Sequence, residues 1–224
     1  MFCFTLLYND DMKNKFSFNK FHWNRKLFVQ ANKDLDHKLI KENSCVLLSA
    51  PHGVTQMRLG VMKFSEIGSL ATAIYLQNAT KSCLIAKTKN NNDDANFDEV
   101  SEYKKTIRSL IANNNIKYVI DFHGLGPRRE CDINLGIHLG KNIETNKEIF
   151  NTLQRTLALY NFNVVIDQPF MAGGNTIAGS MKRVFPNLWT IQIEINSKLT
   201  NRKENFEKLK TLLSILTEWI NSLN

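Results

Sequence analysis

Residues 45–53, CVLLSAPHG, join a short apolar run to a histidine followed by a glycine. Residues 117–124, KYVIDFHG, repeat the arrangement. Apolar runs of this length are typical of strands that are covered on both faces of a sheet. A glycine permits an unusual backbone angle at a turn. The two stretches therefore predict buried strands with His52 and His123 immediately beyond their ends, where α/β folds place ligand sites.

Short apolar runs alternate with longer helical periods from residue 44 onward, which predicts an α/β sheet with crossover helices. The expected strands are residues 45–50, 83–87, 117–122, 132–137, 163–167 and 189–195, and the expected helices are residues 64–77, 99–113, 146–159 and 204–223. Residues 1–43 carry aromatic side chains in a polar setting and predict irregular structure or edge hairpins on the main body.

The composition indicates an ordinary folded protein. The chain has 224 residues, of which 43% are hydrophobic, and we expect one domain spanning residues 1–224. Four scattered cysteines form no CxxC pair and are taken as reduced thiols. The net charge of +8 accompanies no nucleic-acid-binding motif, so we expect no nucleic-acid partner. Without a signal-peptide pattern or an apolar run of about 20 residues, we expect a cytoplasmic protein with no membrane partner.

His52 and His123 form a candidate metal site, since neutral imidazole is a common zinc ligand. Two such side chains at neighbouring strand ends can share an ion with a carboxylate and leave a position open for water, which is the pattern of a catalytic site. The alternative is that each histidine satisfies backbone groups of its loop. Asp121 lies two residues before His123 and could hold an imidazole tautomer or stabilise a turn.

The third metal ligand must come from elsewhere, because HExxH and HxxE spacings are absent and Thr55 stands where HxxE would place a glutamate. Glu66 is the best candidate, at the start of the helix that follows the His52 loop. The alternative for Glu66 is a solvated first-turn residue favoured by the helix dipole.

Glu194 is a carboxylate inside the otherwise apolar strand WTIQIEI. A desolvated glutamate tends to have a raised pKa and suits general base and then general acid chemistry beside a metal. Gln192 faces the same way because side chains repeat every two residues along a strand. If the strand were at a sheet edge, Glu194 would face water instead.

Further candidates surround these residues. Arg58 is a candidate catalytic residue that stabilises a developing oxyanion, and guanidinium groups near the histidine loops can also bind a substrate carboxylate. Residues 170–175, FMAGGN, form a weak candidate for an anion-cradling loop. The candidate substrate-binding residues are Arg128, Arg129, Gly173, Gly174, Asn175 and Gln192.

The ordered set SAPHG, Glu66, DFHG, FMAGGN and QIEIN resembles the N-formylglutamate amidohydrolase family over residues 49–196. The resemblance implies a single-domain, three-layer α/β/α sandwich with a mixed, mainly parallel sheet, similar to zinc carboxypeptidases and aspartoacylase-like deacylases. It also implies a catalytic zinc held by His52, Glu66 and His123, with Glu194 as the general base. The sequence departs from the family at AKTKNNNDDAN, where an Asp-x-Asn-Arg stretch is expected.

The resulting expectation is a zinc-dependent amidohydrolase that cleaves the acyl amide bond of a small N-acyl amino acid, such as N-formylglutamate, or of a short peptide. Another divalent metal would serve the same role. A non-catalytic metal- or ligand-binding protein with the same fold is the alternative. A third possibility, a polyanion-binding protein, predicts steeply salt-dependent nucleic-acid affinity and no metal.

Overall fold

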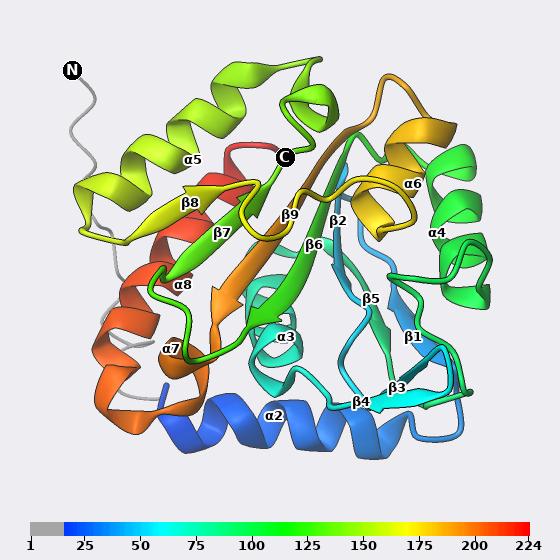
Figure 1. Ribbon diagram of the computed structural model, residues 1–224, viewed down its shortest axis with the longest axis horizontal. Coiled ribbons are helices and arrows are strands. Elements are labelled where there is room, and N and C mark those ends of the chain that lie inside the picture. The colour runs from blue at the N-terminus through cyan, green and yellow to red at the C-terminus, as the bar shows by residue number, and fades with distance from the viewer. Residues whose placement is uncertain (1–15) are drawn as a thin grey trace.

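The computed structural model describes residues 16–224, which form one seven-stranded sheet in the order β1-β5-β2-β6-β9-β7-β8 (Figure 1). The four central strands β5, β2, β6 and β9 are parallel. β1 pairs antiparallel with β5, and β7 pairs antiparallel with β9 and parallel with β8. The strands are β1 (His37–Ile40), β2 (Val46–Ala50), β5 (Cys83–Lys87), β6 (Tyr118–Leu125), β7 (Ile133–Gly136), β8 (Val164–Ile166) and β9 (Trp189–Asn196).

Helices cover both faces of this sheet (Figure 1). One apolar core packs α3, α5 and α8 against one face, and a second core packs α4 and α6 against the other. The helices are α2 (Phe18–Ala31), α3 (Ile67–Thr80), α4 (Glu102–Asn113), α5 (Lys147–Leu159), α6 (Ile177–Val184), α7 (Ser197–Asn201) and α8 (Phe206–Asn221). The predicted α/β/α sandwich with a mixed, mostly parallel sheet is confirmed. Within the described residues, no helix has the length and apolar character that crossing a membrane requires.

Side chains alternate along the central strands β6 and β9, so polar residues can face the opposite side of the sheet from their apolar neighbours. Ile120 and Phe122 of β6 belong to the α3/α5/α8 core, so Asp121 and His123 face the α4/α6 side. The β9 residues Ile191, Ile193 and Ile195 also belong to the α3/α5/α8 core. Gln192 and Glu194 therefore face the α4/α6 side. All of these polar side chains are buried, and the sheet gathers them on one face.

The N-terminal segment differs from its prediction. A helix, α2, occupies residues 18–31 in place of irregular structure or a hairpin. Between residues 16 and 43, β1 is the one edge strand. Ser17 begins the helix by accepting a hydrogen bond from the Lys20 backbone N–H at 3.2 Å. Phe21 is buried on α3 and α8, so a tertiary contact decides the conformation. The part of the prediction that precedes residue 16, including Cys3, lies outside the described residues.

The structure also moves the bounds of other elements and adds short ones. β6 runs to Leu125, so His123 lies inside the strand and not beyond it, while His52 follows β2 as expected. α3 begins at Ile67 with Glu66 as its N-cap residue, three residues later than predicted. Helix α6 and the hairpin of β3 (Gln56–Arg58) and β4 (Val61–Lys63) were not anticipated. Each is short, and periodicity is a weak signal over so few residues.

Candidate metal centre

His52, Glu66 and His123 converge at the carboxyl ends of β2 and β6, which are neighbours in the sheet. One ligand atom from each lies within 4.8 Å of the others. Glu66 Oε1 is 2.8 Å from His52 Nδ1, and Glu66 Oε2 is 3.3 Å from His123 Nδ1. The Gly124 backbone N–H donates to Glu66 Oε2 at 2.8 Å and fixes the carboxylate between the two rings. The three residues that the sequence predicted as ligands therefore do meet.

The far nitrogen of each ring is held by a buried carboxylate. His52 Nε2 lies 2.9 Å from Asp94 Oδ1, and His123 Nε2 lies 2.9 Å from Asp121 Oδ2. Because an ionised carboxylate only accepts, each Nε2 carries a hydrogen, and in the neutral imidazole each Nδ1 then presents a lone pair. The two Nδ1 atoms face each other at 3.2 Å.

This arrangement brings three acceptors together, which requires protons or a metal cation between them. Burial alone would lower the pKa of both histidines, but Glu66 and Asp94 raise that of His52, and Asp121 and Glu66 raise that of His123. Burial alone would raise the pKa of Glu66, but the effect of the two imidazoles is larger, so the pKa of Glu66 is lowered. Two imidazoles and a carboxylate, backed by hydrogen-bonded carboxylates, are a donor set that fits zinc.

Asp94 is a residue of this cluster that sequence reasoning missed. It is fully buried, and its Oδ2 accepts from Arg58 Nε at 2.8 Å and Nη2 at 2.7 Å. It comes from the stretch that departs from the expected Asp-x-Asn-Arg pattern. Within that stretch, residues 94–97 read DANF.

Two buried hydroxyl groups, those of Ser49 and Tyr103, help to hold Asp121 in place. Ser49 Oγ donates to Asp121 Oδ1 at 2.7 Å, and Tyr103 Oη lies 3.0 Å from Ser49 Oγ. Tyr103 in turn donates to the Ile85 carbonyl at 2.8 Å. Of the two roles left open for Asp121, the structure shows the one that holds an imidazole.

Glu194 lies beside this cluster on β9, directly opposite His123 in the β6–β9 register. Its side chain is buried, and burial raises its pKa to about 7 despite the nearby histidines. Gln192 Nε2 donates to Glu194 Oε1 at 2.7 Å. β9 is interior to the sheet, so the alternative of an edge-strand glutamate facing water does not apply. The site thus holds a carboxyl group that can exchange a proton near neutral pH.

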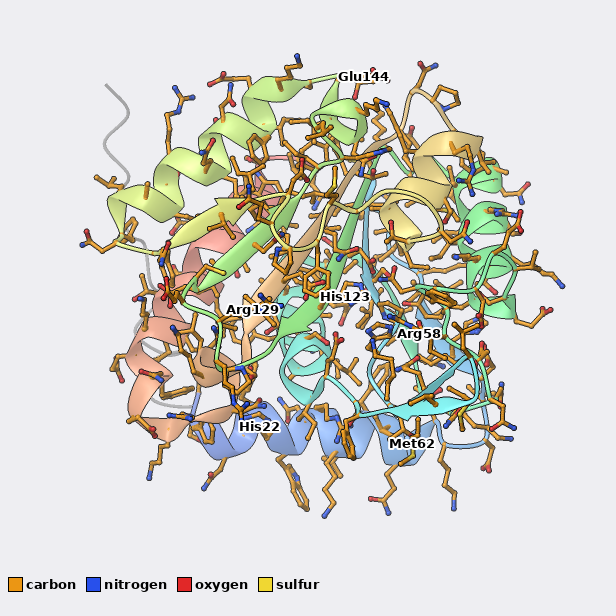
Figure 2. All side chains as sticks on the ribbon, viewed as in Figure 1. His22, Arg58, Met62, His123, Arg129 and Glu144 are labelled. Carbon is orange, nitrogen blue, oxygen red and sulfur yellow. The ribbon has the colours of Figure 1, made fainter. Side chains whose placement is uncertain are left out.

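A pocket of about 480 Å³ opens over these residues. Figure 2 labels two of its lining residues, Arg58 and His123, near the middle of the view. Its lining residues are His52, Arg58, Lys63, Glu66, Asn96, Phe97, His123, Gly124, His138, Pro169, Phe170, Met171, Ala172, Gly173, Thr176, Gln192 and Glu194. The mixture of apolar walls and a few converging polar groups is typical of small-molecule sites.

Some of the other residues predicted to bind substrate line the pocket and some do not. Gly173 lines the pocket, whereas Gly174 and Asn175 do not. Arg128 and Arg129 are exposed on the loop after β6 and also lie outside the lining. His138, which the sequence gave no reason to select, lines the pocket from the loop after β7. These placements follow from loop paths that a one-dimensional pattern does not determine.

The comparisons with known proteins agree on the fold. No protein-family model matches the chain, and no curated protein matches it. The crystal structure of gene product Atu2144 from Agrobacterium tumefaciens matches with a TM-score of 0.61 and 13% identity, covering 89% of this chain and 97% of that one. The crystal structure of N-formylglutamate amidohydrolase from Ralstonia eutropha JMP134 matches with a TM-score of 0.53 and 15% identity, covering 84% of this chain and 98% of that one. The predicted resemblance is thereby confirmed at the level of the fold.

Proposed function

We propose that this protein is a zinc-dependent amidohydrolase that cleaves the acyl amide bond of a small N-acyl amino acid, of the N-formylglutamate type, or of a short peptide. The observation that carries the proposal is the position of Glu194. A buried carboxyl group with a pKa of about 7 lies in the same pocket as the ligand atoms of His52, Glu66 and His123. We further propose a cytoplasmic location, with no nucleic-acid or membrane partner.

His52, Glu66 and His123 would hold the zinc ion, which would make the attacking water more acidic and polarise the scissile carbonyl. Glu194 takes one proton from the attacking water, whose oxygen forms a bond to the acyl carbon. The C–N bond then breaks, and Glu194 returns the proton to the leaving nitrogen. One amide and one water thus give a carboxylic acid and an amine.

Arg58 is positioned to assist. Its guanidinium lies 4.8 Å from the centre of the Phe97 ring and is held on Asp94, at the wall of the pocket. The N–H groups that do not bind Asp94 can donate to the oxygen that develops negative charge on the acyl carbon. Asp94 therefore serves both His52 and Arg58 in this proposal.

The test is metal analysis of the purified protein, followed by assay on a panel of N-formyl and N-acetyl amino acids and short peptides. We expect about one zinc per chain and turnover of at least one amide. Glu194→Gln should keep the zinc and lose turnover. A protein that binds no metal, or a variant with full activity, would contradict the proposal.

A non-catalytic metal- or ligand-binding protein is the second candidate. Two observations favour it. The expected Asp-x-Asn-Arg stretch is absent, with Phe97 following Asn96, and Arg58 is partly neutralised by its ion pair with Asp94. Such a protein would bind zinc and retain N-acyl amino acids without converting them. Calorimetry with an N-acyl amino acid and product analysis on the same sample separate the two candidates.

A further inference from the structure

The Gln192 side chain has one unpaired polar atom. Gln192 is 2% exposed and lines the pocket described above. Its Nε2 donates to Glu194, but its Oε1 is buried and accepts no hydrogen bond from any residue that the structure describes. Buried carbonyl oxygens are nearly always paired in folded proteins. An unpaired one on a side chain that lines a pocket points to a donor on the ligand.

Glu194 fixes the orientation of this amide. An ionised carboxylate only accepts hydrogen bonds, so the NH₂ group of Gln192 must face it. Turning the amide over would bring two acceptor oxygens together. The Oε1 atom therefore stays unpaired whenever Glu194 is in the ionised form that a general base needs.

The neighbouring strands supply no donor. Gln192 is opposite Asp121 on β6 and opposite Gly136 on β7. The Asp121 carboxylate is itself an acceptor, already bound to Ser49 and His123. Gly136 has no side chain, and a Cβ there would lie 2.9 Å from the Ala172 Cβ, so no larger residue fits.

We propose that Gln192 Oε1 accepts the N–H of the scissile amide, which makes the site selective for secondary amides over esters of the same shape. This inference rests on the proposed function. The nitrogen whose hydrogen is accepted is the atom to which Glu194 returns a proton, and the two side chains are joined by a hydrogen bond of 2.7 Å. An ester has no hydrogen at that position and leaves Oε1 unpaired.

The expected discrimination follows from the cost of an unsatisfied buried acceptor, which corresponds to about a 10- to 100-fold change in kcat/KM. The experiment compares an N-acyl amino acid with the O-acyl hydroxy acid in which oxygen replaces the N–H. Both are assayed with the zinc-loaded wild-type protein, Gln192→Met and Gln192→Glu. Gln192→Met removes the acceptor at similar length, and Gln192→Glu keeps an acceptor oxygen.

We expect Gln192→Met to lower kcat/KM for the amide about 10- to 100-fold more than kcat/KM for the ester. Loss of the hydrogen bond to Glu194 affects both substrates, so the ratio of amide to ester is the measured quantity. Gln192→Glu should keep the wild-type ratio of amide to ester within about threefold, even if both rates fall. Gln77→Met is the matched control, because Gln77 is a buried glutamine on α3 that binds Glu42 and does not line the pocket. It should leave the ratio unchanged.

Equal loss for amide and ester in Gln192→Met would overturn the inference while the proposed function stands. The inference would also be overturned if Gln192→Glu changed the ratio of amide to ester kcat/KM by more than about threefold. If the wild-type protein turns over neither substrate, the proposed function fails, and the inference fails with it. Zinc content and melting temperature, measured for each variant, exclude loss of the fold as the cause.

Discussion

Asp94→Asn should weaken zinc binding although Asp94 is not a ligand. The Asp94 carboxylate accepts from His52 Nε2 at 2.9 Å and from Arg58 at 2.7 and 2.8 Å. Burial alone would raise its pKa, but these two partners lower it, so the group is ionised at neutral pH. The negative charge makes His52 a better electron donor and holds the lone pair of Nδ1 toward the other ligands.

The magnitude follows from these contacts. Asparagine keeps one oxygen for His52 Nε2 but loses the charge, and its NH₂ group then faces the Arg58 guanidinium, donor against donor. Loss of such an outer partner costs about 10- to 100-fold in metal affinity, or about 1.4 to 2.7 kcal/mol. Because Asp94 is fully buried, little solvent is available to compensate.

The assay is competition for zinc against a chromogenic chelator, with melting temperatures of the metal-free proteins measured in parallel. Asp93→Asn is the matched control, since the adjacent carboxylate binds Lys87 Nζ at 2.7 Å and contacts no proposed ligand. We expect its zinc dissociation constant to stay within about threefold of the wild-type value. If Asp94→Asn binds zinc as tightly as Asp93→Asn, the outer-partner reasoning is refuted.

Three further predictions concern the cluster itself. Glu66→Ala should lose bound zinc as severely as His52→Ala, measured by elemental analysis after dialysis, and full occupancy in the variant would remove Glu66 from the ligand set. Glu194→Gln should lower kcat for the amide about 10²- to 10⁴-fold with zinc content retained, and loss of zinc would instead make Glu194 a ligand. In the metal-free protein, the folded-state pKa of Glu194, about 7, lies above its ordinary value of 4.5. The folded state therefore binds the extra proton, and this contribution to stability is lost as the pH rises from about 4.5 through 7. Urea unfolding should show Glu194→Gln gaining about 2 to 3 kcal/mol over the wild type between these limits, and a difference independent of pH would contradict the raised pKa.

Local sequence determined the central strands and the composition of the site. The runs that end in His52 and His123 are apolar enough to form buried strands wherever they pack. Glu194 is informative because a carboxylate within an apolar strand must have a function or a partner. Alternation along β9 also placed Gln192 on the same side. These inferences depend only on chemistry within a few residues, which a sequence displays directly.

Tertiary structure decided which distant groups meet. Asp94 is 42 residues from His52, and its hydrogen bond exists because the loop after β5 folds back over the end of the neighbouring strand β2. The exposure of Arg128 and Arg129, and the entry of His138 into the pocket, follow from loop paths of the same kind. The helix α2 forms where polar patterning predicted none, because burial of Phe21 on other helices outweighs local preference. Contacts between residues far apart in the chain leave no periodic mark in either segment, so only the folded structure reveals them.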